Sequence, residues 1–125
     1  MGRCPSFWII VGVASLIPAI GHAQSDAVDR TNRAAYEAAI KCFVVDGYAS
    51  TQREKAGDAE KAASYEASAR HSFDVAFAAG ARIGLGDSQV NRDIDYAQVS
   101  ELPKLIRDLD YLKSVAATCK ALHLM

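Results

Sequence analysis

The segment YEAAIKCFVVDGYAS, which covers residues 36–50, carries the pattern that decides the fold. Its large apolar side chains return every three or four positions: Tyr36, Ile40, Phe43, Val44 and Tyr48. On an α-helix this spacing places them on one face, so the segment predicts an amphipathic helix that packs against a core. Gly47 lies within the same stripe and predicts a close approach by a neighbouring helix. Cys42 lies beside the stripe, where it can face such a neighbour.

Helical patterns continue along the chain, and the alternating patterns typical of strands are essentially absent. Alanine, the best helix former, is frequent, and glycine and proline are rare within the long segments. A first helix is predicted at about residues 26–50, with Ser25 or Asp26 as its N-cap. A second helix is predicted at about residues 53–82, and Gly57 can interrupt it.

The second half of the chain predicts two further helices. Gly84 and Gly86, in the sequence GARIGLGD, predict left-handed residues at the end of the second helix. A short third helix is predicted from about residue 88 to Ser100. Pro103 disfavours helical geometry in the residue before it, so a new helix is expected to start there, with Ser100 as its N-cap.

The last helix has the most regular apolar pattern in the sequence. Spacings of three and four residues connect its predicted buried positions, and a seventh residue widens the stripe. These positions are Leu102, Leu105, Leu109, Leu112, Ala116 and Cys119, with Ile106 beside them. The pattern predicts a bundle helix whose buried seam includes the cysteine.

The first residues have the organisation of a secretory signal peptide. Arg3 precedes an uninterrupted apolar and small stretch at residues 7–16, and Gly21 and Ala23 supply small residues before a cut. Even when it is counted from Phe7 to Ile20, the apolar run is shorter than the roughly 20 residues that a membrane span needs, and it contains Pro18. We therefore expect cleavage after Ala23, no stable membrane anchor afterwards, and a periplasmic or secreted protein that begins at Gln24.

The predicted cut divides the chain into a signal peptide, residues 1–23, and one small domain, residues 24–125. Of the three cysteines, Cys4 leaves with the signal peptide, and Cys42 and Cys119 remain. Two thiols in an oxidising compartment most simply form one disulfide. Two separately buried free thiols are the alternative, whereas a zinc site would need further ligands. The sequence thus predicts an all-α domain: a small bundle of three long helices and one short helix, stapled by one disulfide.

Catalytic and cofactor motifs are not found. His71 and His123 have no partner at metal-ligand spacing, so we expect neither metal nor cofactor, and His71 is expected to be neither catalytic nor metal-binding. No serine has a nucleophile-elbow context, and no glycine-rich loop carries the residues that bind phosphate. The chain has 14 Lys and Arg against 15 Asp and Glu, which disfavours nucleic acid as a partner. The sequence nominates no catalytic residue.

Two functions fit these observations. The first is a non-catalytic exported interaction module, such as an accessory, inhibitor or immunity-type protein, whose partner is another protein of the envelope or extracellular space. The alternative is a carrier or sensor of a small apolar ligand in a pocket between helices. Phe73 and Phe77, one turn apart on the second helix, are the predicted lining of such a pocket.

Overall fold

The structure, a computed structural model, describes residues 17–125, and that part of the chain is all-α. Its helices are α2 (Ile17–Lys55), α3 (Ala59–Arg82), α4 (Asp87–Arg107) and α5 (Leu109–Ala121). Most of the predicted signal peptide, including its apolar stretch and Cys4, lies outside the described residues. The helix α2 is continuous through Ser25 and Asp26, so neither residue caps it, contrary to the prediction.

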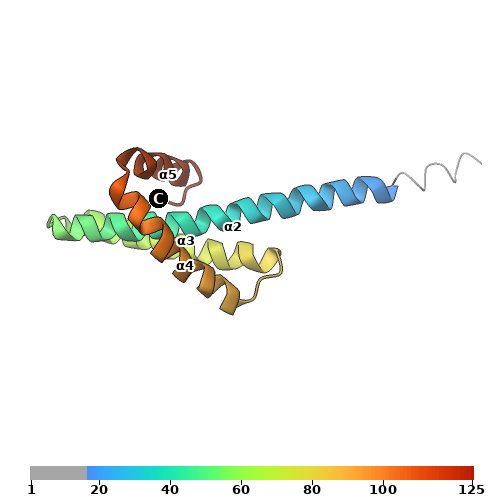
Figure 1. The fold of residues 1–125 in the computed structure, drawn as a ribbon, viewed down its shortest axis with the longest axis horizontal. Helices are drawn as coiled ribbons and strands as arrows, with labels where there is room; N and C mark the ends of the chain where they lie inside the picture. Colours follow the sequence, from blue (N-terminus) through green and yellow to red (C-terminus); the bar gives the residue numbers. More distant parts are fainter. Residues whose placement is uncertain (1–16) are drawn as a thin grey trace, which may run out of the picture. The chain divides into compact units, whose positions relative to one another are not determined.

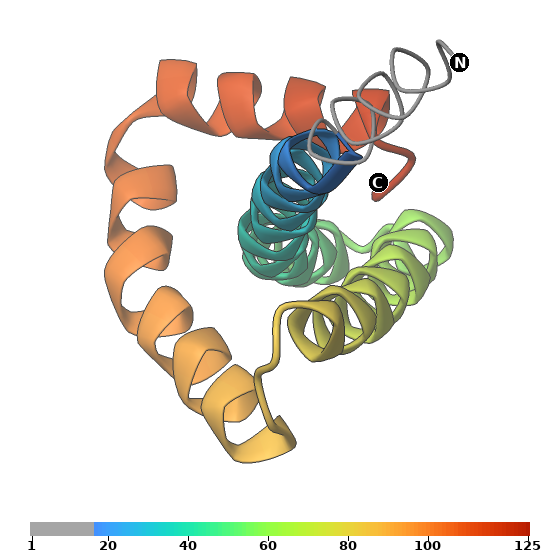
Figure 2. The ribbon, with the colours of Figure 1, turned by 90° about the vertical axis from the view of Figure 1, so that its right-hand side faces the viewer.

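The chain divides into two compact units, Met1–Thr31 and Asn32–Met125. All further statements on packing concern the second unit. There α3, α4 and α5 are arranged around the α2 helix, with α4 and α5 forming a corner on one side of it (Figures 1 and 2). The predicted all-α bundle of three long helices and one short helix, stapled by one disulfide, is confirmed.

Each of α2, α3 and α5 ends in the same hydrogen-bonded turn. The residue after the helix C-cap has a left-handed backbone, and the amide of the residue that follows it donates to the carbonyl oxygen five residues earlier. The left-handed residues are Gly57, Gly84 and His123. This arrangement satisfies helix carbonyls that would otherwise lack a donor. Gly84 therefore has the predicted conformation, whereas Gly86 has an extended backbone (φ −79°, ψ 164°) and precedes α4 as its N-cap.

The break between the last two helices lies eight residues later than predicted. Instead of ending near Ser100, α4 continues through Pro103 to Arg107, so the last helix is the short one. The chain breaks at Asp108, whose backbone is extended and whose carboxylate accepts a hydrogen bond from the amide of Tyr111 (3.0 Å). A favourable N-cap at Asp108 thus marks the boundary, and the first part of the predicted last helix belongs to α4.

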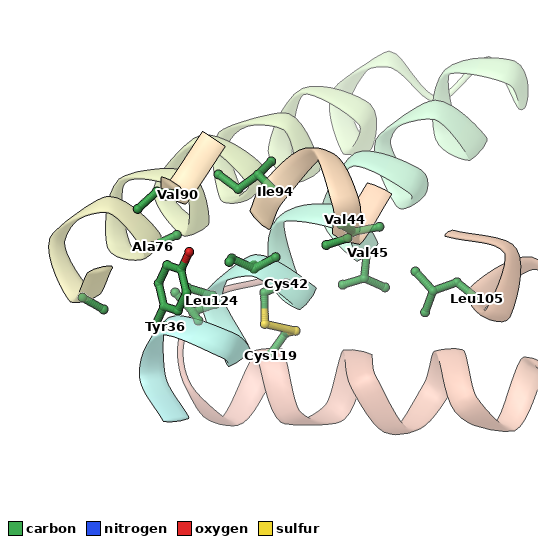
Figure 3. Packing of buried hydrophobic residues seen from close by; sticks show 14 residues of the cluster. Tyr36, Cys42, Val44, Val45, Ala76, Val90, Ile94, Leu105, Cys119 and Leu124 are labelled. Carbon is green, nitrogen blue, oxygen red and sulfur yellow. A yellow bond between two sulfur atoms is a disulfide. The ribbon is translucent and has the colours of Figure 1, made fainter. Parts of the chain in front are cut away.

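This corner has a tertiary reason. A continuous helix would carry Cys119 about 18 Å beyond the end of α4, at 1.5 Å per residue. The turn at Asp108 instead returns α5 across α2, where Cys119 meets Cys42 (Figure 3). The regular apolar pattern of the predicted last helix is therefore divided between two helices. Leu105 and Cys119 are buried, as predicted, but Ile106 and Leu109 are 59% and 61% exposed.

The core fills the space between α2 and the other three helices. It contains three residues of the predicted stripe of the first helix, together with apolar residues of α4 and small residues of α3. Its members include Tyr36, Ile40, Val44, Val45, Ala76, Ala79, Val90, Ile94, Ala97 and Leu105 (Figure 3). The glycine that allows close packing is Gly80, because a Cβ there would lie 2.8 Å from Val90 Cγ2 and 3.2 Å from Tyr36 Cε2. At Gly47 a Cβ would meet nothing within 4 Å, so the close approach predicted there is wrong.

Candidate functional site

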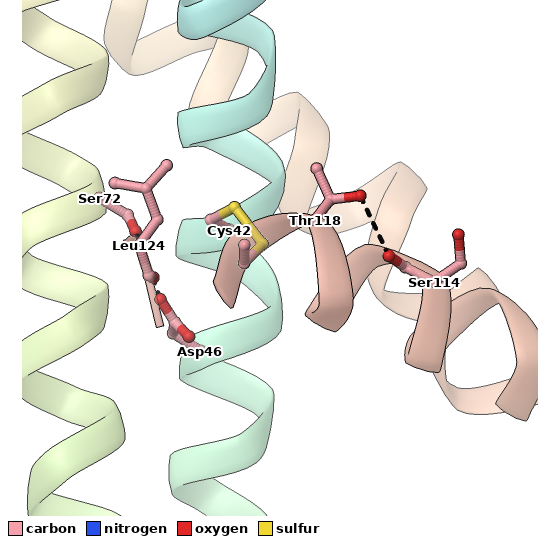
Figure 4. Close-up of a disulfide and its surroundings, with 7 residues drawn as sticks. Cys42, Asp46, Ser72, Ser114, Thr118 and Leu124 are labelled. Atoms are coloured by element: carbon pink, nitrogen blue, oxygen red, sulfur yellow. Dashed lines mark hydrogen bonds between the residues drawn. A yellow bond between two sulfur atoms is a disulfide. The ribbon is translucent and has the colours of Figure 1, made fainter. Parts of the chain in front are cut away.

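The disulfide joins the first and last described helices at the centre of the bundle. Cys42 and Cys119 are bonded, their Cα atoms are 5.6 Å apart, and both residues are essentially without solvent exposure (Figure 4). The bond spans 77 positions of sequence. Closing a loop of that length stabilises a folded chain by about 4 kcal/mol on the loop-entropy account. Its burial separates both sulfur atoms from dissolved thiols, which fits a structural bond better than a redox-active one.

A buried carboxyl group lies one helical turn beyond Cys42. Asp46 has no exposed surface, and its Oδ2 accepts a hydrogen bond from Ser72 Oγ at 3.3 Å. Its Oδ1 is buried and has no hydrogen-bond partner. Burial raises the pKa of Asp46 to about 7, although the hydrogen bond from Ser72 acts in the opposite direction. The carboxyl group is therefore protonated at mildly acidic pH, where an exposed aspartate is ionised.

Ser72 connects this carboxyl group to the end of the chain. Its Oγ lies 3.2 Å from the carbonyl oxygen of Leu124 as well as 3.3 Å from Asp46 (Figure 4). One hydroxyl proton cannot serve both acceptors well. When Asp46 carries a proton, it can donate to Ser72, which then donates to Leu124, and both bonds are made. The group thus fixes α3 and the C-terminal residues against α2, but its burial keeps it from dissolved substrates.

The sequence contained a signal for this carboxyl group that the apolar periodicity did not reveal. Asp46 is four residues after Cys42, and therefore on the same helix face as a cysteine predicted to be buried. An acidic residue at such a position predicts a buried carboxyl group. Its partner Ser72, and Leu124, which Ser72 also contacts, have no sequence signal, because Ser72 lies 26 positions from Asp46 and 52 positions from Leu124.

Two tyrosine–carboxylate pairs lie at the edges of the bundle. Tyr36 Oη donates to Asp93 Oδ2 at 2.6 Å, and burial and this bond together raise the pKa of Tyr36. Tyr111 Oη donates to Glu101 Oε2 at 2.5 Å, and that bond, with burial, raises the pKa of Tyr111 to about 12. Both tyrosines are therefore neutral donors at physiological pH. Each pair connects two helices, α2 to α4 and α4 to α5.

Four hollows between the helices of the Asn32–Met125 unit bear on a binding site. The most spacious of these four, here called the α2–α4 groove, has a volume of about 500 Å³ and a mostly apolar lining: Phe43, Val44, Gly47, Tyr48, Thr51, Gln52, Lys55, Gln98, Leu102 and Ile106. The second, here called the three-helix groove, has about 390 Å³ and is lined by α2, α3 and α5. Smaller hollows adjoin the disulfide (about 350 Å³) and the Tyr36–Asp93 pair (about 380 Å³).

The predicted pocket residues Phe73 and Phe77 lie in an aromatic row. Phe73 packs against Phe43 with ring centroids 5.6 Å apart and against Phe77 at 4.7 Å. All three rings are partly buried against the core. Phe43 also lines the α2–α4 groove, but Phe73 and Phe77 line none of the four hollows. The structure thus places these two rings as packing residues, and the pocket assigned to them stays a prediction.

The two histidines considered as catalytic or metal-binding residues, His71 and His123, are both exposed. His71 lies on α3, and His123 lies in the turn after α5. Among the side chains that the structure describes, those of residues 25–125, no three of His, Cys, Asp or Glu come together as metal ligands. Over residues 17–125, no helix has the length and apolar character that a bilayer span requires.

Comparisons with protein-family models, with curated proteins and with solved structures give no match for this chain.

Proposed function

We propose that the protein is an exported, non-catalytic interaction module that binds another protein through the outer face of α4. The observation that carries the proposal is an apolar stripe on that face. Tyr96, Val99 and Ile106 are 74%, 76% and 59% exposed and lie three and seven residues apart, so they share one side of the helix. Leu109, the first residue of α5, is a further apolar side chain near the end of this helix and is 61% exposed.

The stripe continues into a groove that is suited to a helix. Ile106 belongs both to the stripe and to the lining of the α2–α4 groove, beside Leu102. An amphipathic helix can place its apolar face in such a groove, with anchors every three or four residues. Single exposed apolar residues are common on protein surfaces, but contiguous ones next to a groove are typical of interaction sites. We therefore take the partner's contacting element to be an amphipathic helix.

The predicted export indicates where the partner protein would be found. The predicted signal peptide and the disulfide both agree with an oxidising compartment outside the cytoplasm. The proposed partner is accordingly a protein of the envelope or the extracellular space. This setting fits an accessory, inhibitor or immunity-type role, in which a small rigid domain acts by occupying a surface of another protein.

Site-specific photo-crosslinking in the native envelope tests the proposal. A photoreactive amino acid replaces Val99 in one protein and Ala63, an exposed residue of α3, in another. We expect Val99 to yield a crosslink to one protein, Ala63 to yield none to it, and Ile106→Glu to abolish the crosslink at Val99. The matched control is Ala67→Glu, at an exposed position of α3, and it should leave the crosslink at Val99 intact. A crosslink that forms equally from both positions, or only to a second copy of this chain, would contradict the proposal.

A further inference from the structure

The three-helix groove combines an apolar floor with unpaired positive charge. Its apolar lining comes from α2, the turn after α2, α5 and the last residue: Val45, Ala49, Ala56, Leu112, Ala116 and Met125. Three exposed cations, Arg53, Lys113 and Lys120, also line it, and the lining contains no Asp or Glu side chain. The polar part of the lining is completed by Tyr48, Gln52 and Tyr65.

These three cations have no acidic partner in the described part of the chain. The ion pairs among residues 17–125 are Lys61–Asp58, Arg70–Glu66 and Lys104–Glu101, with none at the groove. The other hollows differ in this respect. The hollow at the disulfide has one acid and one base, the hollow at Tyr36 has acids and bases together, and the α2–α4 groove has a single lysine. Among the four, only the three-helix groove has several basic side chains and no acidic side chain.

We propose that the three-helix groove binds an amphiphile with one alkyl chain and an anionic head group, of the class of long-chain carboxylates. The alkyl chain would lie on the floor formed by Val45, Ala49, Leu112 and Ala116, and the carboxylate would lie among the cations at the rim. This site is separate from the outer face of α4 and goes beyond the interaction proposed for that face.

Size favours a small amphiphile over a protein as the occupant. The groove volume of about 390 Å³ lies in the range of clefts for small ligands, roughly 300–1,000 Å³. A stable protein interface instead covers about 800 Å² on each partner, which this groove alone does not offer. Charge complementarity then favours an anionic head group. Three unpaired cations attract an anion, whereas they do not attract a neutral head group and they repel a cationic one.

Calorimetric titration with dodecanoate, below its micelle concentration, tests this site on the disulfide-bonded protein. We expect saturable binding of one dodecanoate per chain, weakened by salt because the cations are exposed. Dodecyltrimethylammonium, with the same alkyl chain and a positive head group, should bind at least tenfold more weakly. Equal binding of the two amphiphiles would overturn the proposal.

Charge removal tests the rim. Replacement of Arg53, Lys113 and Lys120 by Gln should weaken dodecanoate binding roughly tenfold, because each exposed ion pair contributes modestly. The matched control replaces three exposed cations outside the groove, Arg82, Arg92 and Arg107, by Gln and should leave the affinity unchanged. An equal loss of affinity in both variants would show that net charge, not this groove, binds the anion.

Filling the groove tests its floor. Ala116→Phe should abolish dodecanoate binding, whereas Ala78→Phe on the exposed side of α3 should not. Circular dichroism confirms that each variant is folded, and amide chemical shifts that change at Ala49 in the unsubstituted protein locate the ligand independently. If the protein binds anionic vesicles but shows no saturable dodecanoate binding, the three cations contact a membrane surface instead of a single amphiphile, and the proposal is refuted.

Discussion

Asp46 provides the sharpest quantitative prediction, because a buried carboxyl group makes stability depend on pH. Its pKa is about 7 in the folded chain against an ordinary value of 3.8. Between these pH values the folded chain keeps a proton that the unfolded chain has released. The free energy of unfolding therefore falls as the pH rises from about 4 to about 7, and the penalty is constant above that. At about 1.4 kcal/mol for each pKa unit, the total loss is on the order of 4 kcal/mol.

The perturbation that isolates this effect is Asp46→Asn, which keeps the shape and removes the titration. The amide group of the variant brings a new donor to a position that has no hydrogen-bond partner in the wild type. We therefore expect the unfolding free energies of the two proteins to differ by roughly 1–3 kcal/mol already at pH 4. The informative quantity is the difference in unfolding free energy between the D46N variant and the wild-type protein. We expect that difference to shift in favour of the variant by about 4 kcal/mol between pH 4 and pH 8.

Urea unfolding at one-unit intervals from pH 4 to pH 8, with the disulfide intact, measures this difference. All other titrating groups are shared by the two proteins and cancel when they are independent of residue 46. Asp95→Asn is the control, since Asp95 is exposed on α4 and its replacement should change stability by less than about 0.5 kcal/mol at every pH. Parallel curves for wild type and D46N would refute the reasoning, because they would mean that Asp46 is ionised at little cost.

Three further predictions concern other parts of the molecule. Replacement of both Cys42 and Cys119 by Ala should lower the free energy of unfolding by roughly 2–5 kcal/mol in denaturant titrations, and a loss near zero would deny the bond a structural role. Gly80→Ala should cost about 1–3 kcal/mol through overpacking, whereas Gly47→Ala should add about 0.5–1 kcal/mol; equal effects would contradict the close packing at Gly80. Intact-mass measurement of the exported protein should show a cut after Ala23, and a retained N-terminus would disprove the predicted signal peptide.

The sequence alone was sufficient for the helical character of the chain, for the buried face of its first helix and for the cross-link. Apolar spacing on Tyr36, Ile40 and Val44 predicted the helix and its buried face, because side-chain direction on a helix repeats every 3.6 residues whatever the neighbours are. The pairing of Cys42 with Cys119 was predicted by counting, because loss of Cys4 with the predicted signal peptide would leave two thiols with one intramolecular pairing.

Tertiary structure decided where one helix gives way to the next in the second half of the chain. Pro103 predicted a start, yet it lies inside α4, and the boundary is at Asp108. Local propensity disfavours a proline within a helix by about 3 kcal/mol, but packing of α4 on both sides of it outweighs that cost. Periodicity could not reveal the corner, because the spacing of Leu105 and Leu109 is the same on one helix as on two.

The candidate sites also depend on tertiary structure. Periodicity predicted that Ile106 and Leu109 face the core, but burial requires a neighbouring element, and none covers their side of the bundle in the described residues. Lys113 and Lys120 become a cationic rim together with Arg53 only because α5 folds back across α2. Side-chain direction is a property of the local chain, whereas exposure and charge proximity are properties of which helices lie beside one another, and that arrangement is set by contacts far apart in sequence.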